Sequence, residues 1–391
     1  MPGALDGIRV VELTSMITGP LATMILADQG ADVVKVEPPG AGDVMRYLGS
    51  QRGGMTALFA SCNRSKRSIV VDLKNPDGKD VIHELVRSAD VFIQNYRIGV
   101  IDRLGLGAET LCVANPGLIY VSLNAFGEKG PFASRPAYDH ILQGMTGAAY
   151  VQAKETPEFM RQTWCDKSTA VTAAQAITAA LLARERGAGG QHLHLSMLDA
   201  GLSFLWPDGH ADTMLLEDDA VRLPPIADTY MPSPTADGYA TIAAITEQQW
   251  TNLLIAVGRE ELLADPRFAT TEARLKNLNA FRDEISRSGA QYATEELIER
   301  LGAAEVPCGP ILRPAEVPDE PQVIANQTLV TSEHPTLGRI REPRPPARFD
   351  ATPSEIQRPA PALGEHTSEV LASLGRSDDQ IVALRESGAV S

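Results

Sequence analysis

One stretch, TWCDKSTAV at residues 163–171, carries a carboxylate whose role decides how the sequence is interpreted. Its acidic residue, Asp166, stands directly before the alanine-rich apolar run 169–183, which indicates a buried helix. An Asp at a helix N-terminus accepts backbone N–H bonds as an N-cap, and this is the commoner role by frequency. A carboxylate also serves as a nucleophile, forming a covalent acyl intermediate that splits one difficult transfer into two easier steps. The residues alone favour the cap and leave the nucleophile open.

Other candidate reactive groups are less distinctive. Tyr138, Asp139 and His140 are consecutive in a Gly/Pro-rich loop before a helical pattern. A carboxyl or an imidazole there can do acid–base work, but Asp139 can equally cap the helix that follows. Cys165 has no histidine near it in the sequence to activate its thiol. Asp139 therefore stays open between the two roles, and Cys165 is a weak nucleophile candidate.

Basic side chains form two groups in an acidic chain. NRSKRS (63–68) is followed by Lys74, and NYRIGVIDR (95–103) supplies Arg97 and Arg103. Both groups are expected near the ends of predicted strands, where Lys and Arg can hold phosphates. A solvated basic face is the alternative, and the commoner one for clusters that stand alone.

Familiar cofactor and metal motifs are missing from the sequence. The first strand–helix turn, ELTSMITGPLATM, has Gly19 before Pro20 but no GxGxxG, so a dinucleotide site is not expected. The four cysteines have no CxxC spacing, which argues against a zinc site and a disulfide framework. His192 and His194 alternate on one side of a predicted strand, but no third ligand is near them, and no metal site is expected.

Length and charge restrict the class of protein. A chain of 391 residues is long for one core and suggests two domains. A net charge of −15 disfavours nucleic acid and anionic membranes as partners. No export signal opens the sequence and no apolar run is long enough to span a membrane, so we expect a cytoplasmic protein.

The first half of the chain alternates strand and helix signals. Helical patterns at 19–30 and 76–90 separate short β-branched runs at 8–13, 32–37, 67–73, 90–95 and 118–123. This rhythm predicts an α/β fold with a parallel sheet, whose ligands bind beyond the carboxyl ends of the strands.

The second half has a different texture. A strand-like run at 191–198 follows the long helix, and Pro, Asp and Gly then become frequent. We predict a large domain from 1–205 and 331–391, a linker at 206–236 and a small α+β domain at 237–330. The Pro-rich segment 314–364 shows little periodicity and is expected to run over the surface. The helical pattern at 365–388 is expected to pack back onto the first domain.

Several long stretches resemble one family, the class III coenzyme A transferases of the CaiB–BaiF type. They keep their order along nearly the whole chain: LDGIRVVELTSMITGPLATMILADQGADVVKVEPPGAGD, NRSKRSIVVDLKNPDGK, ADVFIQNYRIGVIDRLGLG, LNAFGEKGPFASRPAYDHILQGMTG, DKSTAVTAAQAITAALLARERGAGGQHLHLSMLDAGL and GEHTSEVLASLGRSDDQI. The resemblance implies a homodimer of two interlocked chains, each with a Rossmann-like large domain and a smaller α+β domain.

The resemblance also implies roles for individual residues. Asp166 becomes the catalytic nucleophile, with Tyr138 and Asp139 as an aromatic–acidic pair beside it. Contacts to the coenzyme are implied for Met16, Ile17, Thr18, Lys74, Asn95, Tyr96 and Arg103. Pro38 stands where some members have an Arg, so a contact to adenine or phosphate at that point is not carried over.

The implied activity is transfer of coenzyme A from an acyl-CoA donor to a small carboxylic acid, through a covalent aspartyl-CoA intermediate. Coenzyme A is then a substrate, and no permanently bound cofactor or metal is expected. A 2-methylacyl-CoA racemase or epimerase is the runner-up, although such relatives use a His where this chain has Tyr138. A non-catalytic CoA-binding protein is the alternative from another class. The loop 206–236, with Trp206, Asp208, His210 and Tyr230, is expected to shape the acyl pocket.

Overall fold

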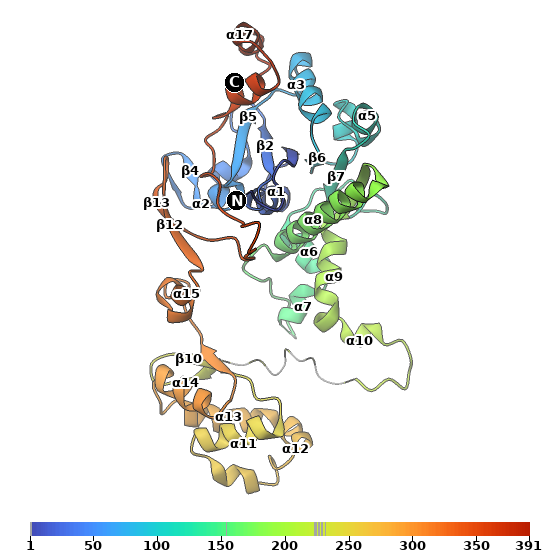
Figure 1. Cartoon of the computed structure of the whole chain (residues 1–391). Coiled ribbons are helices and arrows are strands. Elements are labelled where there is room, and N and C mark those ends of the chain that lie inside the picture. The colour runs from blue at the N-terminus through green and yellow to red at the C-terminus, as the bar shows by residue number, and fades with distance from the viewer. Residues whose placement is uncertain (1, 154, 223–224, 226, 228–229, 231) are drawn as a thin grey trace. The chain divides into compact units, whose positions relative to one another are not determined.

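The computed structural model describes residues 2–153, 155–222, 225, 227, 230 and 232–391. Contacts within the chain divide it into two compact units. Unit 1 comprises Met1–His210 and Gln327–Ser391, and unit 2 comprises Ala211–Asn326 (Figure 1).

A six-stranded parallel sheet forms the centre of unit 1. Its order is β5-β2-β1-β6-β7-β8. The strands are β1 (Arg9–Leu13), β2 (Asp32–Glu37), β5 (Lys66–Val70), β6 (Val91–Gln94), β7 (Ile119–Asn124) and β8 (Gln191–Ser196). All neighbours pair in parallel, so the mixed α/β fold with a parallel sheet is confirmed.

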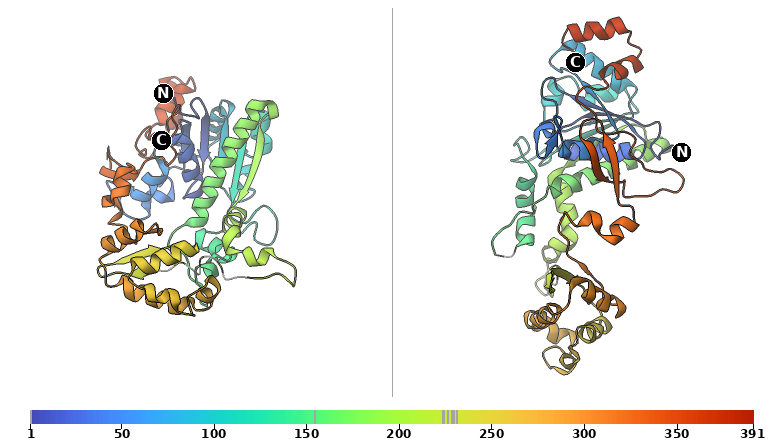
Figure 2. Two further views of the ribbon diagram at one scale, coloured as in Figure 1. Left: turned by 60° about the horizontal axis from the view of Figure 1, so that its bottom comes forward. Right: turned by 90° about the vertical axis from the view of Figure 1, so that its left-hand side faces the viewer.

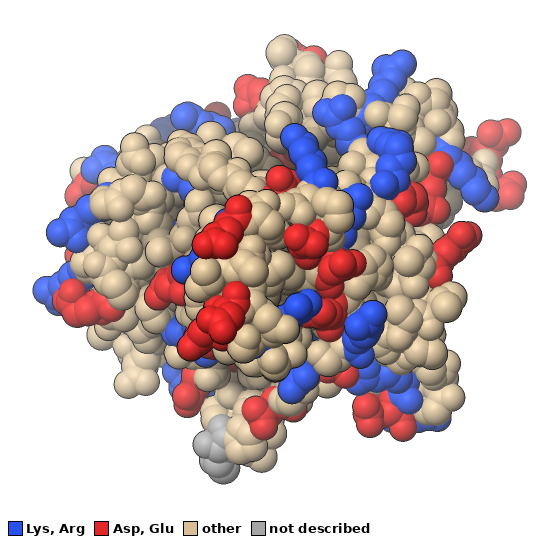
Figure 3. Space-filling view, turned by 90° about the horizontal axis from the view of Figure 1, so that it is seen from above, with Lys and Arg blue, Asp and Glu red and all other residues tan. Residues whose placement is uncertain are grey.

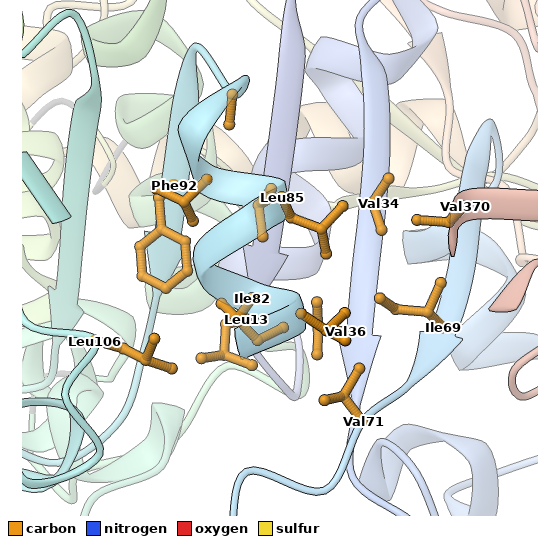
Figure 4. Close-up of a cluster of buried hydrophobic side chains, with 14 of the residues drawn as sticks. Leu13, Val34, Val36, Ile69, Val71, Ile82, Leu85, Phe92, Leu106 and Val370 are labelled. Carbon is orange, nitrogen blue, oxygen red and sulfur yellow. The ribbon is translucent and has the colours of Figure 1, made fainter. Parts of the chain in front are cut away.

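Helices cover both faces of this sheet, as the near-continuous burial of its strand residues requires. One face packs against α3 (Pro76–Arg87), α5 (Ala108–Ala114), α16 (Thr367–Ser373) and α17 (Asp378–Glu386). Figure 4 shows Ile82 and Leu85 of α3 and Val370 of α16 over this face. The expected return of the C-terminal helices to the first domain's sheet is therefore confirmed.

The other face packs against α1 (Thr18–Asp28) and α8 (Trp164–Ala183). Small residues such as Ala173 and Ala174 are buried on α8 and let it lie close to α1. The left view of Figure 2 shows α8, in green, running beside the strands. Among the described helices, none is both long and apolar enough to cross a membrane.

Shorter elements complete unit 1. They are η1 (Val44–Tyr47), β3 (Gln51–Arg52), β4 (Met55–Thr56), α2 (Ala57–Asn63), α4 (Val100–Arg103), α6 (Asp139–Met145), α7 (Ala148–Gln152), η2 (Arg184–Ala188), α9 (Met197–Gly209), β12 (Leu329–His334) and β13 (Gly338–Pro343).

The hairpin of β12 and β13 lies in the Pro-rich segment and is an element that the sequence did not predict. Residues 314–364 show little periodicity and were expected only to run over the surface, yet these two strands pair antiparallel along their length. Their sequences, LVTSEH and GRIREP, are polar on most positions because most of their side chains are exposed or half-buried. Strands that bury little apolar surface lack the alternation that sequence reasoning depends on.

Unit 2 is a small α+β unit with its own core. Its antiparallel sheet has the order β11-β10-β9, and Leu253, Phe281 and Leu297 lie in the apolar cluster beside it. Its elements are α10 (Ala211–Met214), β9 (Pro232–Pro234), β10 (Tyr239–Ile242), α11 (Glu247–Ala256), η4 (Glu260–Ala264), α12 (Thr271–Lys276), α13 (Leu278–Gly289), α14 (Thr294–Ala303), β11 (Cys308–Pro310), η5 (Val317–Asp319) and α15 (Pro321–Ala325).

Candidate active site

Asp166 lies inside the first turn of α8 rather than before it. The helix begins at Trp164, and its N-cap is Thr163, which makes no side-chain capping bond. The expectation that Asp166 caps this helix is therefore wrong. Its carboxylate instead accepts a hydrogen bond from the hydroxyl of Thr18, the first residue of α1. Its backbone N–H donates to Oδ1 of Asp139, at 2.9 Å.

Asp139 is buried and bridges two helices. It is the first residue of α6, whose N-cap is Tyr138, so the alternative that Asp139 caps its own helix is wrong. Its second oxygen accepts a hydrogen bond from Nε2 of Gln143, at 2.7 Å. Asp139 thus supplies a side-chain acceptor to an N–H in the first turn of α8, which is the role that we had assigned to Asp166.

Gln143 is a supporting residue that sequence reasoning missed. It is 2% exposed, donates to the carbonyl of Gln162 at 3.0 Å and accepts from the N–H of Met160 at 2.9 Å. One side chain therefore holds both Asp139 and the segment that leads into α8. The spacing of Asp139 and Gln143, four residues apart on one helix face, is the signal that could have identified the pair.

The environment of Asp166 makes its carboxylate less stable as an anion. Burial is the largest cause, and together with the negative charge of Asp139 it raises the pKa of Asp166 to about 6, against the opposing effects of the Thr18 hydrogen bond and Lys167. Near neutral pH most molecules still carry the ionised, poorly hydrated carboxylate. Such an anion is poised for reaction.

Cys165 is fully buried beside this carboxylate. Burial, followed by the charges of Asp139 and Asp166, raises the pKa of its thiol to about 12. The thiol therefore stays neutral at physiological pH, and a neutral thiol is a poor nucleophile.

The turn that presents Thr18 has an unusual backbone. Met16 has a φ of 65°, in the left-handed region that non-glycine residues rarely adopt. The side chain of Asn95 fixes the preceding residue, accepting from the N–H of Ser15 at 3.1 Å and donating to its carbonyl at 2.8 Å. At Gly19 a Cβ would lie 2.4 Å from Oγ1 of Thr14, so only glycine permits this close turn.

Two helix N-termini converge on Asp166. It belongs to the first turn of α8 and contacts the first residue of α1. The partial positive charge of a helix N-terminus stabilises an anion within the first turn. The arrangement therefore suits a site in which negative charge moves between a carboxylate and a bound reactant.

Ile17 lies in the turn between β1 and α1, whereas Lys74 follows β5, and Tyr96 and Arg103 follow β6. Ile17 is buried, and Tyr96 is half-buried against the core, so that burial raises the pKa of its phenol. Lys74 and Arg103 are exposed. In the described part of the chain, no hydrogen bond or ion pair joins these four residues to Asp166.

Tyr138 differs from Asp139 in its surroundings. Its side chain is 63% exposed, and within the described residues it makes no hydrogen bond to Asp166. Thr18 and Asp139 therefore both form hydrogen bonds with Asp166, whereas the side chain of Tyr138 faces solvent.

A cavity of about 430 Å³ lies at the carboxyl edge of the sheet and includes Tyr96 and Arg97 in its lining. His192 and His194 also line it, with their ring centroids 3.7 Å apart. His192 contacts the hydroxyl of Ser122 at 2.8 Å, and His194 contacts Glu128.

The basic group at residues 63–68 does not form the predicted phosphate site. Its cations enter ion pairs within the chain: Arg64 with Asp28, Lys66 with Glu12, and Arg67 with Asp32. Lys66 and Arg67 begin β5, at the edge of the sheet opposite to its ligand-binding end. On the face that Figure 3 presents, blue and red side chains are interspersed. The alternative of a solvated basic face is likewise wrong for Arg64 and Lys66, which are buried.

The loop expected to shape the acyl pocket is described only in part. Trp206 and His210 stack at 5.1 Å near the end of α9, and Nε2 of His210 lies 2.8 Å from the carbonyl of Thr146. Residues 223–224, 226, 228–229 and 231 of this loop lie outside the described residues.

Comparison with known proteins identifies the class of enzyme. The model of the CoA-transferase family III matches residues 5–367. The chain is 36% identical to succinate–glutarate CoA-transferase of Agrobacterium fabrum, with 95% of each chain covered. It is 33% identical to succinyl-CoA–D-citramalate CoA-transferase of Chloroflexus aurantiacus, covering 98% of this chain and 97% of that one. The crystal structure of a CaiB/BaiF family protein from Brucella suis superposes with a TM-score of 0.85 at 32% identity, covering 96% of this chain and all of that chain.

The chain therefore belongs to the CoA-transferase family III. It is an enzyme of that class, and its reaction moves coenzyme A between an acyl-CoA and a carboxylic acid. This finding sets aside the alternative of a non-catalytic CoA-binding protein.

Proposed function

We propose that Asp166 is the nucleophile of the transfer and carries coenzyme A as a covalent aspartyl thioester. One observation carries the proposal. The half-buried carboxylate of Asp166 lies in the first turn of α8 and accepts a hydrogen bond from Thr18, the first residue of α1. Its elevated pKa follows from burial first, and leaves an ionised form that water stabilises poorly. Thr18 donates its hydrogen bond to Oδ1 of Asp166. In the proposed reaction, Oδ2 of Asp166 is the oxygen that attacks.

The reaction proceeds in two halves. Asp166 attacks the thioester carbonyl of the donor, the C–S bond breaks, and the coenzyme leaves as a thiolate from a mixed anhydride. The thiolate then attacks Cγ of Asp166. The bond between Cγ and the bridging oxygen of the anhydride breaks, and the donor acid departs as a carboxylate. An acceptor carboxylate next repeats these steps in reverse and regenerates free Asp166. Each step consumes one anion and produces another. The partial positive charge of the helix N-termini can therefore stabilise the reacting groups throughout the reaction.

The coenzyme is proposed to lie along the carboxyl edge of the sheet. Its contacts would come from the turn with Met16, Ile17 and Thr18, from Asn95 and Tyr96 after β6, and from the exposed cations Lys74 and Arg103. Exposed cations in such positions suit the phosphates of the coenzyme.

We propose small dicarboxylic acids as the acid substrates. The relatives named above are described as acting on succinate and glutarate, and on succinyl-CoA and citramalate. All of these acids carry a second carboxylate. The direct test offers succinate and glutarate beside butyrate and valerate, their monocarboxylic counterparts. Formation of new acyl-CoA is followed by mass, and transfer at least about tenfold faster to the dicarboxylates is expected. Equal rates would refute this preference.

Two properties of the whole protein are also proposed. The enzyme acts as an interlocked homodimer, each chain having a Rossmann-like domain (1–205 and 331–391), a linker (206–236) and a small domain (237–330). It works in the cytoplasm. Exposed apolar side chains on α8 and α9, among them Val171 and Phe204, support a surface that a second chain covers.

The nucleophile is tested by trapping. Wild-type enzyme incubated with succinyl-CoA without an acceptor should gain the mass of coenzyme A on the peptide that contains Asp166, and hydroxylamine should release it. Asp166→Ala should lose the adduct and transfer while still binding coenzyme A. Asp379→Ala removes an equal charge at an exposed position of α17 and should behave as wild type.

A label on another residue, or substantial transfer by Asp166→Ala, would show that the nucleophile is elsewhere. Deuterium uptake at the α-carbon of a 2-methylacyl-CoA in the absence of an acceptor would instead point to the racemase.

A further inference from the structure

We infer that a buried ion network beneath α1 positions the turn at residues 14–18 and, through Thr18, the carboxylate of Asp166. The inference rests on the proposed role of Asp166 as the nucleophile. We call this set of charged side chains the ion network: Glu12, Lys35, Asp43 and Lys66.

The sheet brings three of these charges together. Glu12 of β1 lies directly opposite Lys35 of β2, and Lys66 of β5 lies opposite Val33 of β2. These positions share one face of the sheet, the face on which α1 packs. All three side chains are fully buried, and Asp43, which follows β2, is 2% exposed. The ion network thus lies between the sheet and the first turn of α1.

Each ammonium group binds carboxylates and the backbone of the turn. Nζ of Lys35 lies 2.9 Å from both Glu12 and Asp43, and 3.0 Å from the carbonyl of Thr14. Nζ of Lys66 lies 2.8 Å from Glu12 and 2.8 Å from the carbonyl of Pro20. The two lysines therefore fix the backbone on both sides of Thr18.

Asp43 fixes the turn between those two points. Its Oδ1 accepts the N–H of Met16 at 3.1 Å and that of Met45 at 3.0 Å. Met16 is the residue with the left-handed backbone, a conformation that costs on the order of 1–3 kcal/mol unless its surroundings enforce it. The hydrogen bond from Asp43 is one of the contacts that enforce it.

Stability alone is a weak explanation for such a network. Removing two carboxylates and two ammonium groups from water is unfavourable, and well-packed apolar replacements of buried ion pairs are often neutral or stabilising. What apolar side chains cannot supply is a set of directed bonds to the carbonyl of Thr14, the N–H of Met16 and the carbonyl of Pro20. These bonds define where Thr18 stands, and Thr18 contacts Asp166.

The test uses Asp43, whose charge can be removed while its bond to the turn is kept. Asp43→Ala removes the acceptor for Met16, whereas Asp43→Asn keeps an acceptor oxygen for Met16 and places an amide NH2 where the second oxygen faces Lys35. We expect Asp43→Ala to lower the rate of aspartyl-CoA formation roughly tenfold to a hundredfold, because small displacements of reacting groups have effects of that size. Asp43→Asn should recover most of this loss.

A double-mutant cycle distinguishes positioning from general damage. Thr18→Val removes the hydroxyl that contacts Asp166 and keeps the shape of the side chain. If Asp43 acts through Thr18, the double variant should lose no more rate than Thr18→Val alone. Both single variants should also shift the acid limb of the pH–rate profile upward, since the Thr18 hydrogen bond lowers the pKa of Asp166. Additive losses with an unmoved acid limb would overturn the inference.

A control removes a buried charge elsewhere. Asp28 pairs with Arg64 at the far end of α1, and within the described residues no hydrogen bond or ion pair joins it to the turn. Asp28→Asn should lower thermal stability but leave the rate of aspartyl-CoA formation within about twofold of wild type. If Asp28→Asn lowers that rate as much as Asp43→Ala, the ion network has no special role.

The two proposals fail in different ways. If Asp166→Ala remains active, the proposed nucleophile is wrong whatever Asp43 does. If Asp166→Ala is inactive and Asp43→Ala matches wild type, only the inference about the ion network is wrong.

Discussion

At the scale of single residues, the reactive carboxylate is held in conditions that disfavour its charge. Thr18 donates to it, while burial and the neighbouring carboxylate of Asp139 oppose its ionisation. Active sites commonly contain groups whose pKa values are shifted in this way. A shift of this kind also affects folding, because the folded and unfolded chains bind protons differently.

Replacing the carboxylate should therefore stabilise the protein. The folded-state pKa of Asp166 is about 6 against an ordinary 3.8, so ionised Asp166 disfavours the folded state above pH 6. Discounted for its partial exposure, the penalty at pH 7 is about 1–2 kcal/mol. Asp166→Asn should raise the thermal midpoint at pH 7 in scanning calorimetry. Below about pH 4 the carboxyl is neutral in both states, so the gain should vanish there; a gain independent of pH would contradict this account.

The same ionisation should set the pH dependence of the chemistry. The attacking form is the carboxylate, so the rate of aspartyl-CoA formation should rise with pH through a midpoint near 6 and level off above it. Single-turnover measurements with donor acyl-CoA and no acceptor avoid the ionisation of the acceptor acid. A rate that is flat between pH 5 and 8 would show that ionisation of Asp166 does not limit the reaction.

At the scale of elements, the sequence predicted the strands better than the contacts among them. The runs that became β1, β2, β6 and β7 matched within a residue or two, because buried strands in a parallel sheet are rich in β-branched residues. Lys66 was assigned to a phosphate site because basic neighbours surround it in the sequence. Its real partner, Glu12, is 54 positions away and is reached only through the order of the sheet.

A signal for the ion network was nevertheless present. Glu12 and Lys35 each stand among buried apolar residues of their strands, RVVEL and DVVKVE. Charged residues are rarely buried unless they are paired, so opposite charges at such positions indicate a pair. The contact between Thr18 and Asp166 had no comparable signal, since it joins two helices whose relative placement only the folded sheet defines.

The support given by α6 should be measurable at Gln143. Gln143→Ala leaves Oδ2 of the buried Asp139 without its donor and frees the segment at Met160–Gln162, at a cost of about 1–3 kcal/mol. Transfer should fall roughly tenfold. Amide exchange at residues 159–163 should become faster. Gln175→Ala, on the exposed side of α8, is the matched control; indistinguishable behaviour of the two variants would rule out this support.

At the scale of the whole molecule, the parts of unit 1 come from both ends of the sequence. Residues of α16 and α17 share an apolar cluster with β1, β2 and β5, so this core is completed only by the end of the chain. Apolar side chains nevertheless remain exposed on α8 and α9, including Leu182 and Phe204. A surface of this kind is usually covered by a partner.

The proposed dimer should appear in solution as a particle of twice the chain mass of 41.9 kDa. Light scattering after size exclusion measures it. Because interlocked chains separate only by unfolding, dilution should not produce folded monomers. Since unfolding releases two chains, the thermal midpoint should rise with protein concentration. A fully active monomer at any concentration would exclude the interlocked arrangement.

The connection between β7 and β8 has a consequence for exchanging parts among relatives. These neighbouring parallel strands are joined by residues 125–190, which contain α6, α7 and α8. One crossover therefore carries Asp166 together with Asp139 and Gln143. A chimera that takes this whole segment from another transferase would receive the nucleophile and the residues that hold it as one unit. Thr18 lies outside the segment, so its hydrogen bond to the nucleophile must form again across the junction.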